Sequence, residues 1–487
     1  MEKIIQKTAE LIGSGWMFIV TLLLFVAETS WLALTSRFPM AFDEAWHFGL
    51  IQFYSHRLNP IVTSQDSSTY RFGAIIGDPS FLYHYLLSFP DRFITLFTGS
   101  LETKVIILRF INIGFAVISL IVLRKLLRLL NLPGGFTNVA ILAFALTPIV
   151  TVLSSQINYD NLLILAVSLC AYQTILFINE LGQKVFNTKR LLMLLCLCLF
   201  SSLVKFTFVP IFIGITLLVI WRVIAYQRRG NINLLTAAKQ SFVSINKYVG
   251  LVLFAGIVLG SFFCIRLYAV NLVTYHSPIP QCNQILSVQD CSQYYSWNRN
   301  YVERQQYIHN PALRTWNVLQ YTAYWASLNV FDLFGEIMPL QGLYYISETF
   351  FTIIGVLGTV ALVCTILNFR TIVRRNVNLL YLTGIGLVYI LFLWARNYND
   401  FRMLGRAMAI DGRYLIPVLI YFYALLGLGL VYALEGRHPL RLAARTSLAL
   451  VVIILFVYYG GYAQYTSQIS PVYGHLNPDN YFLLTPT

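Results

Sequence analysis

The sequence predicts an all-α, polytopic membrane protein, and three observations support this fold class. Hydrophobic residues make up 57% of the 487-residue chain, charged residues make up 11%, and the mean hydropathy is +0.67. Apolar runs of about 20 residues, long enough for a helix to cross a hydrocarbon core of about 30 Å, recur along the whole chain. Short polar stretches separate most of these runs. We expect about eleven transmembrane helices, over residues 11–35, 104–123, 137–155, 161–179, 191–204, 207–224, 248–270, 346–368, 377–395, 414–434 and 446–464.

The basic residues predict how the chain is oriented. If the N-terminus is cytoplasmic, the inside segments hold 19 of the 34 basic residues but only four of the 20 acidic ones. This imbalance follows the positive-inside rule, so the net charge of +14 indicates membrane orientation and not nucleic-acid binding. The first apolar run is too long, and lacks the small-residue cleavage site, to be a secretory signal. We therefore expect a multi-pass protein of the plasma (inner) membrane whose long loops lie on the external, or periplasmic, side.

The long loops divide the chain into parts. Residues 1–272 form an N-terminal transmembrane module, whose first external loop, 36–103, carries apolar residues at helical spacing. Such spacing predicts helices that lie in the membrane interface. Residues 273–345 form an external loop that we expect to be a small cap over the membrane. The C-terminal transmembrane helices follow in 346–466, and 467–487 form an external tail.

Two cysteines lie in the expected cap. Cys282 and Cys291 are nine positions apart in a polar segment that the orientation places outside. An oxidising outer face favours a disulfide between them. The alternative is a pair of unlinked thiols.

Two adjacent carboxylates, Asp43 and Glu44, follow the first apolar run at the rim of the membrane, where charged groups are costly. One interpretation is structural, because acidic residues stabilise helix N-termini and a helix is expected from Ala45. The other is catalytic: the carboxylates would accept a proton from an attacking hydroxyl or bind a metal ion. His47 lies on the same helical face as Glu44, three residues on, and is expected to contact substrate or support the carboxylates.

Two more polar residues are expected at the same rim. Asp160 begins the fourth span with Asn158 beside it, and would cap that helix, bind a metal ion or orient the acceptor. Lys205 follows an apolar stretch, 191–204, that covers only about 21 Å as a helix and therefore ends within the outer leaflet. Its ammonium either reaches out to the lipid headgroups or meets a buried phosphate.

Arginines supply further cations. Four of them crowd the outer loop between the ninth and tenth spans, against the positive-inside trend: Arg396, Arg402, Arg406 and Arg413. Guanidinium groups match phosphate bidentately, which makes Arg406 and Arg413 candidates for phosphate binding. The alternative is that Asp400 and Asp411 pair with some of these arginines. Arg109, inside the second apolar helix, is also expected to have a function.

Carboxylates and cations on one face of a membrane protein fit transfer from a lipid phosphate to a hydroxyl. One carboxylate would activate the acceptor, and cations or a divalent ion such as Mg²⁺ or Mn²⁺ would stabilise the departing phosphate. Two alternatives stay open: a transporter or flippase of an anionic lipid-linked substrate, and a polysaccharide polymerase or ligase. Transporters tend to contain internal repeats, and this sequence shows no convincing halves.

The sequence resembles the GT-C superfamily of integral-membrane glycosyltransferases, which includes protein O-mannosyltransferases and aminoarabinose transferases. Asp43-Glu44 followed by His47-Phe48-Gly49 is similar to the Asp-Glu…His-Phe-Gly signature of the mannosyltransferases. Asp78-Pro79 is similar to the later Asp…His-Pro-Pro stretch, of which the His-Pro-Pro is absent here. Further resemblances are Leu108-Arg109-Phe110, Asn158-Tyr159-Asp160, Lys205-Phe206-Thr207 and, to uncharacterised bacterial members, Gly412-Arg413-Tyr414-Leu415-Ile416-Pro417.

The resemblance, which runs from about residue 40 to 420, implies the GT-C fold and an inverting glycosyltransferase of the cell envelope. Such an enzyme moves a hexosyl or pentosyl unit from a polyprenyl-phosphate donor to a hydroxyl of a glycan, lipid or protein. The resemblance implies that Asp43 is the base with Glu44 beside it, and that Asp160 binds a metal or orients the acceptor. The donor phosphate is expected on Lys205, Arg109, Arg413 and Arg406, and the further substrate contacts on His47, Asp78, Asn158 and Tyr414.

Overall fold

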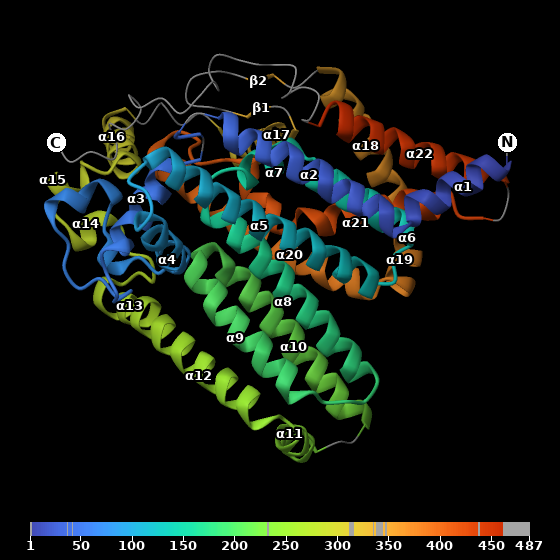
Figure 1. Cartoon of the computed structure of the whole chain (residues 1–487), viewed down its shortest axis with the longest axis horizontal. Helices are drawn as coiled ribbons and strands as arrows, with labels where there is room; N and C mark the ends of the chain where they lie inside the picture. Colours follow the sequence, from blue (N-terminus) through green and yellow to red (C-terminus); the bar gives the residue numbers. More distant parts are fainter. Residues whose placement is uncertain are drawn as a thin grey trace.

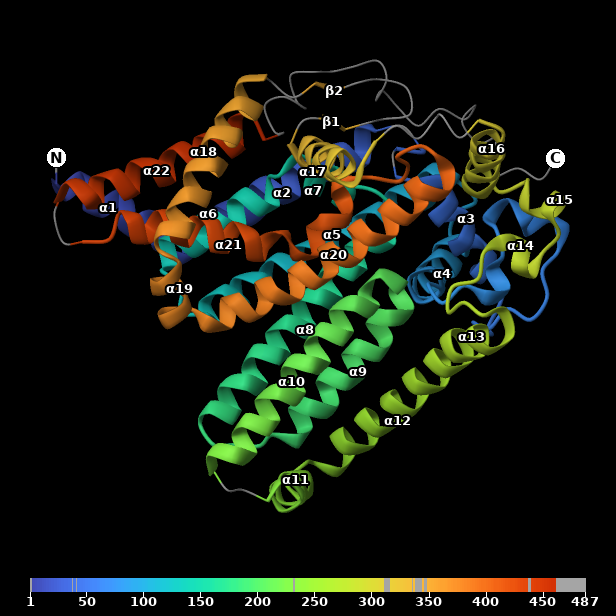
Figure 2. The same ribbon diagram turned by 180° about the vertical axis from the view of Figure 1, so that it is seen from behind.

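The computed structural model describes residues 2–460, except 37, 41, 231–232, 311–315, 335, 338–343, 346–347 and 437–438. In this part of the chain, nine helices or helix pairs are long and apolar enough to cross a membrane (Figures 1 and 2). They are α2 (Gly15–Thr35), α5 (Leu101–Leu129), α8 (Tyr159–Gly182), η3 (Phe206–Phe208) with α10 (Val209–Gly230), α12 (Lys247–Cys264) with η4 (Ile265–Ala269) and α13 (Val270–Tyr275), α18 (Glu348–Leu367), α20 (Val377–Leu404), η6 (Gly412–Leu415) with α21 (Ile416–Ala433), and α22 (Pro439–Tyr458).

The two other expected spans are helical but irregular. Residues 137–155 form α6 (Gly134–Ala145) and α7 (Pro148–Ser154), which meet at an angle of 64° because Pro148 cannot continue the helix before it. Residues 191–204 belong to α9 (Thr188–Val204), which has 17 residues and begins three residues earlier than expected, but is still short for a helix that crosses a hydrocarbon core of about 30 Å. The expected first span, 11–35, starts too early, because α1 (Glu2–Gly13) is a separate helix and Ser14 caps α2.

The segments between the spans form smaller elements. Those on the side of the first long loop are α3 (Glu44–Ser55), η1 (Ser67–Phe72), η2 (Ile75–Gly77), α4 (Leu82–Thr95), α14 (Cys282–Ile285), α15 (Val288–Cys291), α16 (Tyr295–His309) and α17 (Val318–Phe334). The others are α11 (Leu234–Val243), α19 (Phe369–Arg375) and the antiparallel pair β1 (Glu336–Ile337) and β2 (Tyr344–Tyr345).

The first long loop is folded, as expected. Its helices α3 and α4 pack against each other, and Tyr54, Phe72 and Phe81 are buried in a small apolar cluster of their own. The beginning of the cap lies beside this loop, because α15 contacts η1. Cys282 and Cys291 form the expected disulfide. The expected tail, 467–487, lies outside the described residues.

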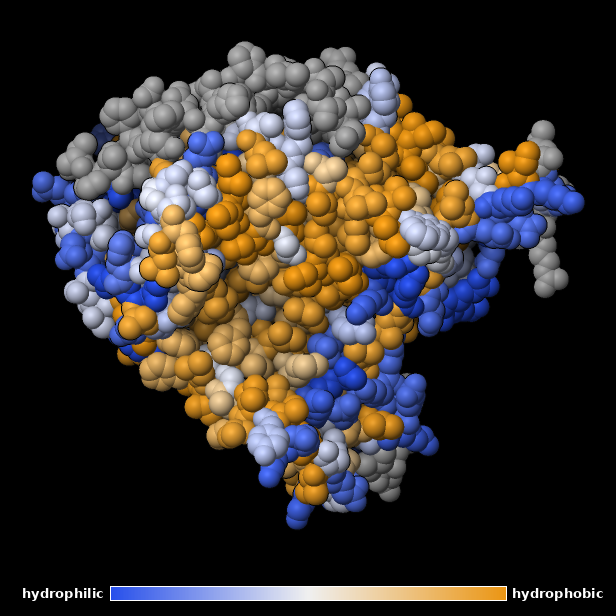
Figure 3. Space-filling view, viewed as in Figure 1, coloured by the Kyte–Doolittle hydropathy of each residue, from blue (hydrophilic) through white to orange (hydrophobic). Residues whose placement is uncertain are grey.

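The polar ends and the apolar middle of the molecule are separate on its surface. Hydrophobic side chains cover the middle of the face seen in Figure 3, whereas hydrophilic ones gather at the end that carries α3, α14 and α15 and at the opposite end. This pattern is typical of a protein whose middle faces lipid. The loops 42–100 and 276–310 therefore occupy one end of the bundle together.

Close helix contacts in this bundle use glycine. The α12 helix packs against α9, and Gly256 and Gly260 lie one helical turn apart on the contacting side. A Cβ atom on Gly256 would stand 2.8 Å from Sγ of Cys196, and one on Gly260 would stand 3.0 Å from Cβ of Leu199. Two small residues four positions apart let helix backbones approach closely in a membrane. The α12 helix is otherwise mostly exposed.

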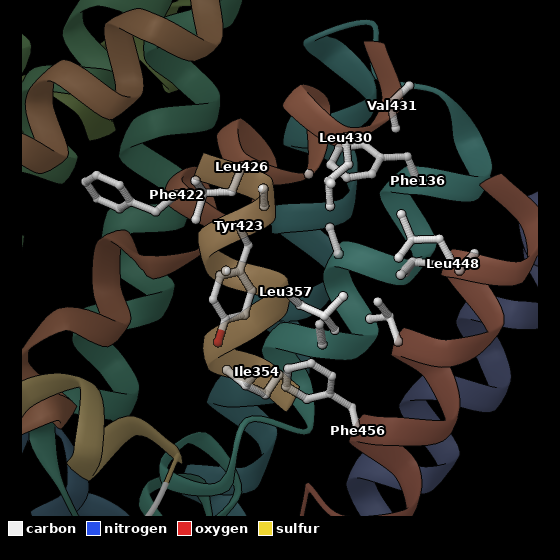
Figure 4. Close-up of a pocket in the computed structure, with 18 of the residues that line it drawn as sticks. Phe136, Ile354, Leu357, Phe422, Tyr423, Leu426, Leu430, Val431, Leu448 and Phe456 are labelled. Atoms are coloured by element: carbon white, nitrogen blue, oxygen red, sulfur yellow. The ribbon is translucent and has the colours of Figure 1, made fainter. Parts of the chain in front are cut away.

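A cavity of about 860 Å³ lies among the C-terminal helices α18, α21 and α22 and helix α6 (Figure 4). Its walls are almost entirely apolar, with Phe136, Leu357 and Phe456 among the residues that face it. None of the acidic or basic residues expected at the site lines it. The cavity is therefore not the place where a phosphate would be held.

Candidate active site

Residues from distant parts of the chain meet at the end of the bundle that carries the first long loop. Asp43 precedes α3, Asp160 is in the first turn of α8, and Lys205 joins α9 to η3. Arg413 and Tyr414 belong to η6, at the start of the α21 span. The contacts described below join all five, although Asp43 and Arg413 are 370 positions apart.

Asp43 has an exposed carboxylate that its backbone conformation turns outward. It occupies the N-cap position of α3, but its side chain makes no cap hydrogen bond. Phe42 and Asp43 both have positive φ angles, 51° and 65°, which residues other than glycine rarely adopt. The Asp43 side chain is 60% exposed, and Oδ2 lies 3.5 Å from Nη2 of Arg413. The structural alternative, in which Asp43 caps the helix, is therefore wrong.

Glu44, in contrast, is fully buried in an ion pair with Arg109. The Nε and Nη2 atoms of Arg109 each donate to one carboxylate oxygen of Glu44 at 2.8 Å, and both side chains are 0% exposed. The backbone N–H groups of Met40 and Ile157 donate to the same carboxylate at 2.7 and 3.1 Å. Arg109 also donates to two carbonyl groups at the end of α2.

This pairing changes two expected roles. A carboxylate that already accepts four hydrogen bonds and has no exposed surface cannot take a proton from an incoming hydroxyl. An arginine that binds this carboxylate and two carbonyl groups has no exposed donor for a phosphate. The expectations that Glu44 is catalytic and that Arg109 binds phosphate do not fit this geometry. The pair instead joins α2, α3 and α5 to the segment before α8.

Lys205 lies in an aromatic and acidic enclosure. Its Nζ atom donates to Oδ1 of Asp160 at 2.6 Å and stands over the rings of Tyr159 and Tyr414, at 4.2 and 4.6 Å from their centroids. The side chain is 3% exposed, so it does not reach out to lipid headgroups. An ammonium group offers three donors, and only one of them is used by Asp160.

Asn158 positions Asp160. Its side chain accepts the backbone N–H of Asp160 at 2.9 Å and caps α8, so the expectation that Asp160 is the cap is wrong. The Nδ2 group of Asn158 donates to the carbonyl of Phe42 at 2.9 Å. Asn158 therefore ties the start of α8 to the turn that exposes Asp43.

Arg413 is buried against acidic and aromatic groups. Its Nε lies 3.2 Å from Oδ2 of Asp411, and its Nη2 donates to the hydroxyl of Tyr414 at 3.1 Å. The guanidinium also lies 4.7 Å from the ring of Phe42. Its Nη1 atom is buried and has no hydrogen-bond partner among the described residues. A buried unpaired donor is costly unless a ligand accepts from it.

Arg406 and Asp78 lie elsewhere in the loops. Arg406 is half exposed and pairs with Glu303 of α16 at 2.9 Å, so it joins the C-terminal spans to the cap. Its side chain therefore does not fit the expected role of binding the phosphate together with Arg413. Asp78 accepts the backbone N–H of Ser80 at 2.8 Å and shapes the turn that leads into α4. Burial raises the pKa of Asp78 above its ordinary value.

One close neighbour of the expected residues, His84, could not be found from the sequence. His84 of α4 lies beside His47 of α3, and their Nε2 and Nδ1 atoms are 2.9 Å apart. The two histidines are 37 positions apart, and His84 belongs to no recognised motif. Only the packing of α3 on α4, which hydropathy does not specify, brings them together.

A divalent cation does not fit the acidic residues of this site. Oδ2 of Asp160 is buried and has no hydrogen-bond partner among the residues that the structure describes, but Oδ1 already binds the ammonium of Lys205, and Arg413 lies nearby. In the ranges that the structure describes, no three His, Cys, Asp or Glu side chains are grouped to hold a metal ion. Lys205 and Arg413 lie among the carboxylates of Asp160, Asp411 and Asp43, so each carboxylate already has a cation beside it that would repel a dication. We therefore derive no step from a metal.

Comparison with solved structures shows a protein whose fold this chain shares. No family model matches the chain, and no curated protein matches its sequence. A crystal structure of the Archaeoglobus fulgidus oligosaccharyltransferase in complex with Zn and sulfate matches 97% of this chain with a TM-score of 0.50 and 14% identity. A second crystal structure of that protein, tethered to an acceptor peptide, matches 96% with a TM-score of 0.48 and 13% identity. This chain spans 58–60% of the length of those chains.

Proposed function

We propose, on the premise of the GT-C fold that this chain shares with the oligosaccharyltransferase structure, that the protein is an inverting glycosyltransferase. It would take one sugar from a polyprenyl-phosphate donor and transfer it to a hydroxyl of a glycan, lipid or protein. The proposed site is the group formed by Asp43, Asp160, Lys205, Arg413 and Tyr414. The positive-inside pattern and the Cys282–Cys291 disulfide support an external position for this end of the bundle.

One observation carries the proposal: the exposed carboxylate of Asp43 stands beside the buried guanidinium of Arg413, and a second buried cation, Lys205, lies near Arg413. Asp43 is 60% exposed, whereas the side chains of Glu44 and Asp160 are 0% and 2% exposed and already paired. Lys205 and Arg413 are buried, and in the described part of the chain Nη1 of Arg413 has no hydrogen-bond partner. The exposed carboxylate can be reached by solvent and by an acceptor, whereas the buried cations are shielded from water. This arrangement suits the transfer of a sugar to a hydroxyl with departure of a phosphate.

The reaction is a single displacement. Asp43 accepts the proton of the acceptor hydroxyl while that oxygen forms a bond to the anomeric carbon of the donor sugar. The bond between the anomeric carbon and the phosphate oxygen breaks, and its electron pair stays on the polyprenyl phosphate. Lys205 and Arg413 then stabilise the negative charge that the leaving phosphate gains. This stabilisation is strong because both side chains are buried away from water. Attack opposite to the leaving group inverts the anomeric configuration.

Asp160 and Tyr414 have supporting roles in this scheme. The carboxylate of Asp160 holds the Lys205 ammonium in place between the rings of Tyr159 and Tyr414. Tyr414 also accepts a hydrogen bond from Arg413, so one ring orients both cations. A pre-oriented pair of cations stabilises the leaving phosphate without having to reorganise.

The test uses the purified protein in lipid nanodiscs. Undecaprenyl phosphate carrying radiolabelled mannose or glucose is supplied together with a membrane extract as the source of acceptors. We expect Asp43→Asn to reduce release of undecaprenyl phosphate at least about 100-fold and to leave binding of undecaprenyl phosphate unchanged. Asp66→Asn, at an exposed carboxylate of the same loop, is the matched control. Sugar transfer at the wild-type rate by the Asp43→Asn variant would exclude Asp43 as the general base.

Metal dependence is tested in the same assay. Because Lys205 already binds Asp160, we expect EDTA to leave the transfer rate unchanged. Loss of activity in EDTA that Mg²⁺ or Mn²⁺ restores would contradict this assignment. Mass spectrometry of surface glycans and glycolipids from cells with and without the gene would then identify the acceptor.

A further inference from the structure

The apolar cavity of about 860 Å³ among the C-terminal helices takes no part in the proposed reaction. Side chains from three helices face it: Phe136 of α6, Leu357 of α18 and Leu448 of α22 (Figure 4). Pockets that bind small ligands commonly have volumes of about 300–1,000 Å³ and mostly apolar walls. The cavity therefore has the size and the lining of a binding site for an apolar ligand.

One side of the cavity is open. Gly355, Thr359 and Leu362 of α18 line the cavity and are also exposed. At Gly355 and Gly358, no atom beyond the neighbouring backbone of the same helix lies within 4 Å of an added Cβ atom. Because α18 is long and apolar enough to cross the membrane, its exposed side faces lipid. A membrane lipid can therefore enter the cavity from the bilayer.

A cation lies at one end of this apolar space. Of the residues that the structure describes, Arg445 is the only charged one that lines the cavity. Its Nε atom is buried and has no hydrogen-bond partner in that part of the chain. Arg445 belongs to the second turn of α22, and α22 follows the end of α21 after a short connection. Arg413 of the proposed site lies just before the other end of α21. Arg445 is therefore at the end of the cavity away from that site.

The surroundings of Arg445 carry an excess of positive charge. Arg375 pairs with Glu435 at 2.7 Å, and Arg441, one turn before Arg445 on α22, donates to the backbone carbonyl of Glu435. Two arginines thus lie beside this one carboxylate, and Arg445 adds a third cation. Basic pockets between membrane-spanning helices attract anionic lipid headgroups, and a guanidinium donates strongly to a phosphate.

We propose that the cavity binds one anionic phospholipid, whose phosphate accepts hydrogen bonds from Arg445 and whose acyl chains lie between α6, α18 and α22. The apolar walls stabilise the acyl chains, because both are removed from less favourable surroundings when they meet. The proposed donor lipid does not fit this position. Its phosphate is assigned to Lys205 and Arg413, at the other end of α21, which would leave the Nε atom of Arg445 without an acceptor.

The headgroup end is tested by native mass spectrometry of the full-length protein in mild detergent, titrated with phosphatidylglycerol or phosphatidylcholine. We expect one tightly bound phosphatidylglycerol per chain and about fivefold weaker binding of phosphatidylcholine, whose choline the excess of arginines repels. Arg445→Gln should weaken the binding of phosphatidylglycerol about tenfold, as the loss of a hydrogen bond to a charged group does. Arg228→Gln, at an exposed arginine of α10 that does not line the cavity, should leave it unchanged.

The acyl end is tested by filling the cavity. Gly358→Leu places a side chain in it and should weaken the binding of phosphatidylglycerol. Gly384→Leu is the matched control, because the space around this glycine of α20 is equally open and Gly384 does not line the cavity. A second measurement needs no variant: phosphatidylglycerol with a photoreactive acyl chain should crosslink to residues of α18 and α22 that line the cavity, as mapped by mass spectrometry.

Several results would overturn the proposal. These are a wild-type protein that retains no phospholipid, a pair of chains that excludes phospholipid, and equal effects of Arg445→Gln and Arg228→Gln. Displacement of phosphatidylglycerol by undecaprenyl phosphate would show that the cavity holds the tail of the donor instead. None of these results bears on the role of Asp43, so this inference and the proposed function fail separately.

Discussion

Replacing Arg109 by methionine should destabilise the protein severely, because it leaves the buried carboxylate of Glu44 without its cation. Both side chains are 0% exposed, and two hydrogen bonds of 2.8 Å join them. Removing one partner of a buried ion pair costs about 3–5 kcal/mol, whereas replacing both by apolar groups of similar size is often neutral. We therefore expect Arg109→Met to lose about 3–5 kcal/mol and Glu44→Leu with Arg109→Met to recover most of it.

The assay is unfolding of the purified protein by titration with SDS, followed by tryptophan fluorescence. Arg375→Met is the control, because Arg375 forms an ion pair of 2.7 Å with Glu435 that is half exposed, and its loss should change stability little. Equal effects of Arg109→Met and Arg375→Met would refute the reasoning. The double variant also tests the earlier expectation for Arg109: if it folds but no longer binds undecaprenyl phosphate, Arg109 is a phosphate ligand after all.

Three further predictions follow from the packing. Gly358→Ala should stabilise α18 by about 0.5–1 kcal/mol, because no atom beyond the neighbouring backbone of its own helix lies within 4 Å of the added methyl group. Gly429→Ala should destabilise the protein, since its methyl group would stand 2.5 Å from a backbone nitrogen of α18, and the same SDS titration measures both changes. Gly256→Cys should crosslink to Cys196 under mild oxidation, as seen by mass spectrometry, and Gly250→Cys should not. Burial lowers the pKa of His84 from 6.5 to about 3, so the unfolded chain binds more protons than the folded protein below pH 6.5, and the free energy of unfolding should fall as the pH drops from 7 to 5. His84→Leu should reduce this fall, and an unchanged slope in that variant would exclude a buried neutral histidine at this position.

Hydropathy and charge predict the membrane spans well, because the bilayer imposes one dominant constraint on composition. The short helix α9 and the bend at Pro148 both follow from the sequence. The ends of the first span do not, since α1 continues the helical pattern and only the cap at Ser14 separates it from α2. The tail lies outside the described residues, so this expectation stays a prediction.

The sequence predicts only part of the arrangement at the candidate site. Asp43, Asp160, Lys205 and Arg413 could be placed on one side because the loops that carry them alternate regularly with the spans. Their pairing could not be predicted, since it depends on contacts between segments far apart in the sequence. Adjacent residues illustrate this: Asp43 is exposed because a left-handed turn precedes α3, whereas Glu44 begins the helix and points into the bundle.

The separate roles of two arginines also could not be predicted from the sequence. Arg406 and Arg413 lie in one loop and share the same charge, and nothing in their spacing distinguishes them. The structure directs Arg406 to Glu303 of the cap and Arg413 to Asp411 and Asp43. Only the arrangement of α16 and η6 around the end of α20 separates the two roles.

The Glu44–Arg109 pair also has a consequence for how the protein is made. The Glu44 carboxylate is translated long before Arg109, and it is fully satisfied only when the N–H of Ile157 is also in place. Until then, a bare carboxylate stands at the edge of the lipid, where it is costly. The charge of Glu44 is therefore balanced only when the chain has reached Arg109, and the carboxylate gains its full set of donors only near the start of α8.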